Sequence, residues 1–219
     1  MEREKRTYMD IVRHYEDCFK LHGDCCKGVD WPNEADAEKR HRVMLELKAF
    51  DRIHPAVDEK VSVLDFGCGL GHLYRYIEEK GLGFSYTGMD ISDVFIGRCK
   101  AKYPEAKFIC ADILKEDIES FGKYDYVIAN GVFTEKREMA FEEMFQYTRQ
   151  VLCKLYKLCR YGMAFNAMSK DVDWEREDLF HLPLNDLSRF LVNDIGRDYI
   201  IRNDYGLYEY TVYVYKRET

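Results

Sequence analysis

Between positions 63 and 72 the sequence contains the stretch Val63-Leu64-Asp65-Phe66-Gly67-Cys68-Gly69-Leu70-Gly71-His72. An apolar strand here runs into a glycine-rich turn, and a helix follows. Glycines let a backbone turn sharply and approach a ligand closely, and the free N–H groups at a helix start favour anions. A dinucleotide-binding turn needs the spacing G-x-G-x-x-G, whereas His72 leaves this one as G-x-G-x-G. The stretch therefore predicts an α/β domain with a ligand at this turn, and it disfavours a nucleotide-dependent oxidoreductase.

Strands and helices alternate on the carboxyl side of this turn. Apolar runs predict strands over residues 61–66, 84–89, 106–110, 124–129, 161–167, 199–202 and 208–215. Helical spacing predicts helices over residues 70–80, 93–103, 139–158 and 184–193. Such alternation is typical of a Rossmann-like, mostly parallel sheet with helices on both faces. The last two strands are joined only by residues 203–207, so they must form an antiparallel β-hairpin. We expect a seven-stranded sheet.

The residues before position 55 show helical spacing without intervening strands. We therefore predict two parts: an N-terminal helical segment (1–54) and the main domain (55–219). Apolar residues recur at helical spacing up to residue 22, and Asn33 is placed to cap a second helix. The segment is rich in aromatic residues. These side chains either form a lid over a site at the sheet edge or pack the first helices onto the sheet, and the two roles are compatible. The candidate lid residues are Tyr8, Tyr15 and Trp31.

Polar side chains follow the predicted strands where a ligand would lie. Asp90 ends the second strand, and its carboxylate is suited to a ribose diol, although it or Ser92 is also suited to cap the next helix. Asp112 and Ile113 follow the third strand and suit an adenine ring, the alternative being an exposed loop aspartate. Asn130 follows the fourth strand. Its backbone carbonyl suits a ligand ammonium group, and its side chain suits a second substrate.

These motifs together resemble the class I S-adenosylmethionine-dependent methyltransferases over residues 55–217. The resemblance rests on the glycine turn, on Tyr86-Thr87-Gly88-Met89-Asp90-Ile91-Ser92, on Asp112, and on Tyr124-Asp125-Tyr126-Val127-Ile128-Ala129-Asn130-Gly131. It implies S-adenosylmethionine as cofactor, S-adenosylhomocysteine as product, and a cofactor site made of Asp65, Gly67, Cys68, Gly69, Gly71, Asp90, Ile91, Ala111, Asp112, Ile113, Asn130 and Gly131. One departure is Asn130-Gly131-Val132-Phe133, which differs from the Asn-Pro-Pro-Tyr type and disfavours methylation of a nucleobase amino group.

The resemblance leaves the methyl acceptor and the catalytic base open. A base is needed only where the nucleophile holds its proton tightly, as a hydroxyl does. The candidate bases are His22, His72 and His181, and Phe133 joins the aromatic lid residues as a candidate for the substrate side. The other histidines are expected on helix surfaces; they are His14, His41 and His54.

Composition narrows the function. The 219 residues carry a formal net charge of −7, which disfavours a non-specific grip on nucleic acid. No apolar run is long enough to cross a membrane, and no signal sequence follows the charged start. The eight cysteines include no C-x-x-C pair, so we expect reduced thiols in a cytoplasmic protein and predict no metal site. The sequence does not specify an oligomeric state.

The predicted activity is methyl transfer to an oxygen or nitrogen of a small molecule: a metabolite, a natural product or a nucleotide-linked sugar precursor. The alternatives are a tRNA or protein methyltransferase, for which a basic strip beside the pocket would argue, and a non-catalytic S-adenosylmethionine-binding protein.

Overall fold

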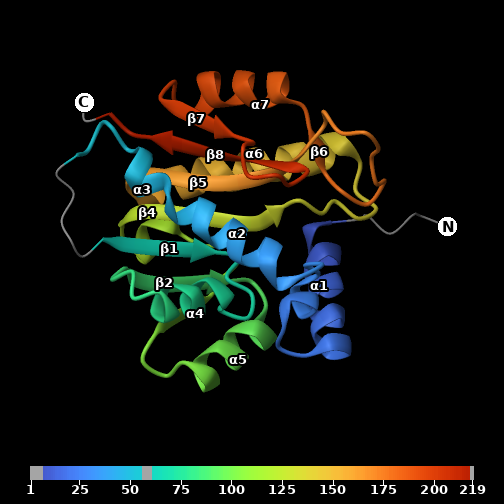
Figure 1. Cartoon of the computed structure of the whole chain (residues 1–219), viewed down its shortest axis with the longest axis vertical. Helices are drawn as coiled ribbons and strands as arrows, with labels where there is room; N and C mark the ends of the chain where they lie inside the picture. The colour runs from blue at the N-terminus through green and yellow to red at the C-terminus, as the bar shows by residue number, and fades with distance from the viewer. Residues whose placement is uncertain (1–6, 56–60, 218–219) are drawn as a thin grey trace.

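The computed structural model describes residues 7–55 and 61–217, and within them one sheet organises the chain (Figure 1). Seven strands follow the order β3-β2-β1-β4-β5-β8-β7, and a short eighth strand, β6, pairs with β5. The strands β1 to β5 are parallel, while β8 runs antiparallel to both β5 and β7. Their bounds are β1 Ser62–Phe66, β2 Ser85–Asp90, β3 Lys107–Cys110, β4 Tyr124–Phe133, β5 Cys159–Ser169, β6 His181–Leu182, β7 Tyr199–Arg202 and β8 Glu209–Tyr215.

Helices cover both faces of this sheet because successive strand residues point to opposite sides. Leu64 and Val127 belong to one apolar cluster with α6 and α7, whereas their neighbours Val63 and Tyr126 belong to a second with α2, α3, α4 and α5. The helices are α1 Tyr8–His22, α2 Glu34–Leu45, α3 Leu47–Phe50, α4 His72–Glu79, α5 Asp93–Lys102, α6 Phe141–Leu158 and α7 Leu184–Phe190, with short turns η1 Cys26–Val29, η2 Ile118–Phe121 and η3 Leu191–Ile195.

The first helix, α1, lies beyond the arrowheads of β1 and β2, at the carboxyl edge of the sheet (Figure 1). It begins with a capping box: the Met9 N–H donates to the Thr7 hydroxyl, and the Thr7 N–H donates to the Asp10 carboxylate. Further along the helix, the ring of Phe19 packs edge-on against Phe95 of α5. The N-terminal segment therefore covers the edge at which the sequence predicts a ligand.

The predicted Rossmann-like α/β architecture is confirmed, and the C-terminal hairpin pairs residues 199–202 with 211–214. Some local predictions were wrong. The second helix breaks at Glu46 into α2 and α3, and the helix predicted to end at residue 193 passes into a π-helical turn after Phe190. The strand β4 also extends to Phe133, four residues beyond its predicted end.

The extension of β4 contains a bulge. Ala129 pairs with Phe165 and Phe133 with Ala167, so four residues of β4 advance opposite two of β5. A bulge of this kind re-aims side chains locally. After the bulge, Phe133 pairs within the strand again, and its side chain is fully buried against Phe165. It therefore does not face the cavity, where the sequence analysis expected it to contact a substrate.

Among the residues that the structure describes, no helix combines the length and the apolar character needed to cross a membrane.

Candidate functional site

A cavity lies at the carboxyl edge of the sheet, under α1. It is lined by residues from the first turn, the ends of β2 and β4, the loop after β3, and the N-terminal segment. Of the predicted residues, those that line it are Tyr8, Tyr15, Trp31, Asp65, Gly67, Cys68, Gly69, His72, Asp90, Ile91, Ala111, Asp112, Ile113, Asn130 and Gly131. Gly71, Phe133, His22 and His181 are not among the lining residues. The structure thus brings most of the predicted site together.

The glycine turn forms the floor of the cavity. Gly67 and Gly69 have backbone φ angles of +73° and +51°, which residues that carry a Cβ adopt only under strain. A Cβ on Gly67 would lie 2.5 Å from Cγ2 of Val132. Gly71 is also left-handed, with φ of 73° and ψ of 27°, and serves as the N-cap of α4. The turn therefore exposes bare backbone to the cavity.

Asp90 is buried at the end of β2, and both of its carboxylate oxygens accept backbone hydrogen bonds. The Gly69 N–H donates to Oδ2 at 2.8 Å and the Ser92 N–H to Oδ1 at 2.9 Å. Ser92, rather than Asp90, caps α5, because its hydroxyl accepts from the N–H of Phe95. Burial raises the pKa of Asp90. An ionised carboxylate has about four acceptor positions, so two remain for a ligand diol.

Asp112 contacts the N-terminal segment. The hydroxyl of Tyr8 donates to its Oδ2 at 2.8 Å, and the Tyr8 ring stacks on that of Tyr147 with centroids 5.1 Å apart. Partial burial opposes ionisation of Asp112, but the hydrogen bonds from Tyr8 and Lys115 prevail and lower its pKa. The N-terminal segment is thereby bonded directly to a residue predicted to bind adenine.

Asp65 is a buried acid of the cavity wall whose pKa is strongly raised. It is 3% exposed at the end of β1 and accepts a 2.7 Å hydrogen bond from the Tyr86 hydroxyl. Burial outweighs that hydrogen bond and raises the pKa of Asp65 to about 7.

This shift predicts a pH dependence of stability. The unfolded carboxyl group has a pKa near 3.9, so between about pH 4 and pH 7 the folded chain holds the extra proton and the free energy of unfolding falls as pH rises. In urea titrations across this range, Asp65→Asn should reduce that fall. Asp125→Asn is the control: bonds from Ser62 and Arg160 lower the pKa of Asp125 despite its partial burial. Its contribution to stability is therefore lost only below about pH 4, and Asp125→Asn should leave the slope between about pH 4 and pH 7 nearly unchanged. An unchanged slope in Asp65→Asn would contradict the assignment.

Asn130 carries the clearest sign that the cavity receives a polar ligand. Asn130 is among the lining residues and is only 9% exposed, yet neither its buried amide nitrogen nor its buried amide oxygen has a hydrogen-bond partner. Buried polar groups are almost always paired, because an unmet group costs about 1–3 kcal/mol. By contrast, the nearby Asn166 amide is fully engaged: its Oδ1 accepts from the Gly131 N–H and its Nδ2 donates to Glu209.

The N-terminal segment is fastened over the cavity by polar contacts. Asp24 lies 3.1 Å from Nε2 of His72 and 2.9 Å from the Lys102 ammonium group, and Glu16 accepts from the Ser92 hydroxyl at 2.7 Å. Trp31 lies close over the bulge, since a Cβ on Gly131 would approach its ring to 3.4 Å.

Of the three histidines predicted as candidate bases, one lines the cavity and two do not. His72 lines the cavity, and burial lowers its pKa although Asp24 opposes the shift. His22 is exposed at the end of α1. His181 is buried, with Nδ1 donating to the Ser169 carbonyl at 2.7 Å and Nε2 accepting from the Arg176 N–H, so both ring nitrogens bind backbone.

His41 is a cavity residue that the sequence analysis missed. It was expected on a helix surface, but it is 5% exposed, packs between the rings of Trp31 and Tyr76, and lines the cavity. Burial, together with nearby positive groups, lowers the pKa of His41 to about 3. Its spacing from Ala37 and Met44, which are also buried, was the available signal. The expectation also failed for His54, whose side chain is 6% exposed and bonds Asp51.

The charge of the cavity favours a cationic ligand. Among the described residues that line it, the acidic side chains are Asp65, Asp90 and Asp112, and none is lysine or arginine. The two histidines of the wall have lowered pKa values and are neutral near pH 7. A ligand that carries positive charge is therefore attracted to this wall, where one acid, Asp112, is already paired with Lys115 at 3.0 Å.

Comparisons with known proteins find similar sequences and folds among methyltransferases. Residues 63–153 match the sequence model of a methyltransferase domain. A Mycobacterium tuberculosis protein with a provisional methyltransferase name is 28% identical over 160 residues, covering 71% of this chain and 93% of the relative. Two solved structures share the fold. Magnesium protoporphyrin IX methyltransferase from Synechocystis, with bound S-adenosylmethionine, has a TM-score of 0.65 at 19% identity, covering 99% of this chain and 100% of its own. A plantazolicin methyltransferase with S-adenosylhomocysteine and a substrate analogue has a TM-score of 0.64 at 14% identity, covering 96% and 91%.

Proposed function

We propose that this chain, which matches the sequence model of a methyltransferase domain over residues 63–153, is a class I S-adenosylmethionine-dependent methyltransferase, and that it methylates an oxygen or nitrogen of a small molecule. The observation that carries the proposal is the buried, unpartnered amide of Asn130, a residue in the wall of an acid-lined cavity beside the glycine turn. The acceptor classes are those expected from the sequence: a metabolite, a natural product or a nucleotide-linked sugar precursor. The named substrates of the two solved structures, a porphyrin and a peptide natural product, support this choice.

The residues present fit the cofactor. When bound, S-adenosylmethionine supplies a methyl group on a positively charged sulfur. In this proposal Asp90 accepts hydrogen bonds from the ribose, Asp112 and Ile113 receive the adenine ring, and the bare backbone of the glycine turn contacts the amino-acid part. The backbone carbonyl of Asn130 receives the ammonium group, which leaves its side-chain amide for the acceptor. The acidic wall suits the positive charges of the ligand.

The lid excludes water and orients the reactants. Residues 7–54 hold Tyr8, Tyr15 and Trp31 at the cavity wall, and two of these also bond the domain, through Asp112 and through the Gly131 carbonyl. Methyl transfer needs chiefly alignment of nucleophile and methyl group, so a closed aromatic wall serves the chemistry. Release of the methylated product then requires the lid to open.

We assign His72 as the base for acceptors that must lose a proton. It is the only one of the three predicted candidates that lines the cavity. Its Nε2 is held by Asp24, a carboxylate that orients the ring and stabilises its protonated form. Burial keeps the imidazole neutral before reaction. The location we propose is the cytoplasm, since all eight cysteines are free, a usage typical of reducing compartments.

A labelled-methyl experiment tests the function. The protein is incubated with S-adenosylmethionine labelled in its methyl group and with a metabolite extract, and the small-molecule, RNA and protein fractions are analysed by mass spectrometry. The proposal predicts label in a small molecule. Label confined to RNA or protein would overturn the acceptor class, and binding of the cofactor without any transfer would overturn the activity.

The two neighbouring asparagines give a matched prediction. Asn130→Ala removes no hydrogen bond within the protein, so the free energy of unfolding should change by less than about 1 kcal/mol while methyl transfer falls at least about tenfold. Asn166→Ala removes the hydrogen bonds that the Asn166 amide makes with the Gly131 N–H and with the Glu209 carboxylate. It should therefore lower the free energy of unfolding by about 3 kcal/mol. Urea unfolding and the labelled assay measure both. Full activity in Asn130→Ala would show that the Asn130 amide does not take part in methyl transfer.

A further inference from the structure

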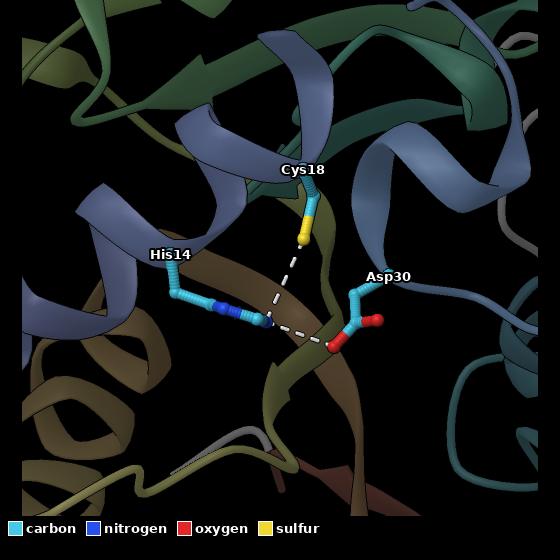
Figure 2. Close-up of side chains that lie close together, drawn as sticks. All are labelled: His14, Cys18 and Asp30. Carbon is cyan, nitrogen blue, oxygen red and sulfur yellow. Dashed lines mark hydrogen bonds and ion pairs between the residues drawn. The ribbon is translucent and has the colours of Figure 1, made fainter. Parts of the chain in front are cut away.

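Three side chains with metal-binding atoms converge outside the cavity wall (Figure 2). His14 and Cys18 are four residues apart on α1 and therefore share one helix face, and Asp30 follows η1. Figure 2 shows the three pointing toward one another. Nε2 of His14 lies 2.9 Å from Oδ2 of Asp30 and 3.7 Å from Sγ of Cys18, and all three donor atoms lie within 4.8 Å of one another.

These separations approach those of a tetrahedral zinc site. Zinc binds imidazole nitrogen, carboxylate oxygen and thiolate sulfur at about 2.0–2.3 Å, so the donor atoms of one ion lie roughly 3.3–3.6 Å apart. The 3.7 Å nitrogen–sulfur distance is close to that value, and the 2.9 Å nitrogen–oxygen distance needs to lengthen by only about half an ångström. The third pair, the Asp30 carboxylate oxygen and the Cys18 sulfur, lies within 4.8 Å and would have to shorten by at most about 1.2 Å.

The backbone holds Asp30 in place independently of any cation. Asp30 adopts the left-handed conformation, with φ of 55° and ψ of 31°. Its N–H donates to the Lys27 carbonyl, and the Trp31 N–H donates to the Cys26 carbonyl, which closes the turn on both sides of the carboxylate. The ligands thus come from two rigid elements, α1 and the η1 turn, as a preorganised site requires.

The surroundings tolerate a cation. Two arginines lie close enough to interact with the cluster, Arg137 and Arg176. Arg137 is bonded to both Glu135 and Asp178 at 3.3 Å and Arg176 is paired with Asp178, so both charges are compensated. The side chains of His14 and Asp30 are 21% and 38% exposed, which gives an ion access from solvent and leaves room for a water molecule as fourth ligand.

We propose that His14, Cys18 and Asp30 bind one Zn²⁺ ion, with water completing the tetrahedron. Such an ion joins α1 to the η1 turn. Tyr15 follows His14 and Trp31 follows Asp30, and both line the cavity, so the ion braces two parts of the aromatic wall. The role is structural, and it stands whether or not the acceptor proposed above is right.

Cobalt substitution tests the site, because Co²⁺ reports thiolate ligands by a charge-transfer absorption band and tetrahedral geometry by intense visible bands. The whole chain, stripped of metal and reduced, is titrated with Co²⁺ and then with Zn²⁺ as competitor. The proposal predicts one tetrahedral Co²⁺ per chain with one thiolate ligand, displaced by one equivalent of Zn²⁺.

Three variants identify the ligands. Cys18→Ser should lose the charge-transfer band, and Asp30→Asn should weaken binding by more than the roughly 10- to 100-fold that loss of an outer-shell partner costs. Asparagine tolerates the left-handed conformation, so Asp30→Asn should keep the fold, which circular dichroism checks. Cys110→Ser, at an exposed cysteine of β3, is the control and should bind as wild type. Absence of a thiolate band in the wild type, or its survival in Cys18→Ser, would overturn the site.

Discussion

Asp90→Ala should bind S-adenosylhomocysteine at least about 100-fold more weakly than the wild type in isothermal titration calorimetry. Two hydrogen bonds from a ribose diol to a carboxylate contribute about 1.5–3 kcal/mol each, and 1.4 kcal/mol corresponds to a tenfold change in affinity. The substitution also frees the Gly69 N–H, which Asp90 holds at 2.8 Å, so the glycine turn becomes less well ordered. Both effects act in the same direction.

Asp93→Ala is the matched control for this result. Asp93 is exposed in the first turn of α5, three residues from Asp90, and does not line the cavity. Its replacement should leave the affinity within about twofold, because exposed substitutions rarely exceed 0.5 kcal/mol. Equal affinities for Asp90→Ala and Asp93→Ala would contradict the assignment of Asp90 to the cofactor.

Gly67→Ala should lower the free energy of unfolding by about 3 kcal/mol in urea titrations. A left-handed conformation costs a residue with a Cβ about 1–2 kcal/mol, and overpacking adds about 1–3 kcal/mol. The overpacking arises because the new Cβ would lie 2.5 Å from Cγ2 of Val132, a residue that also lines the cavity. Cofactor affinity should fall along with stability, since relief of the clash moves the cavity floor.

Gly81→Ala separates these two causes. Gly81 follows α4 with a φ of +61°, the Leu82 N–H there donates to the Ile77 carbonyl, and a Cβ on Gly81 would meet nothing within 4 Å. It should lose only the conformational part, about 1–2 kcal/mol, and should bind the cofactor as the wild type does. Similar losses in Gly67→Ala and Gly81→Ala would mean that the contact with Val132 is unimportant.

The sequence predicts the architecture well because local signals and the fold agree. Alternating apolar periodicities and the short connection at residues 203–207 determine a mostly parallel sheet with a final hairpin. The acids after β2 and β3 are predictable for the same reason: the carboxyl ends of parallel strands meet at one edge.

The remaining features depend on contacts between distant segments. The bulge before Phe133 arises from pairing with β5, and no local signal marks it. His41 becomes a cavity residue only because Trp31 and Tyr76 enclose it. Likewise, the proximity of Asp30 to His14 requires a left-handed turn at a non-glycine residue, which sequence patterns do not predict.

A crystal structure of the chain with S-adenosylhomocysteine tests the account most directly. We expect the nucleoside under α1, with both ribose hydroxyls within hydrogen-bond distance of Asp90 and the adenine edge against Asp112. Clear density for the ligand at any other place on the chain would contradict the assigned cofactor site.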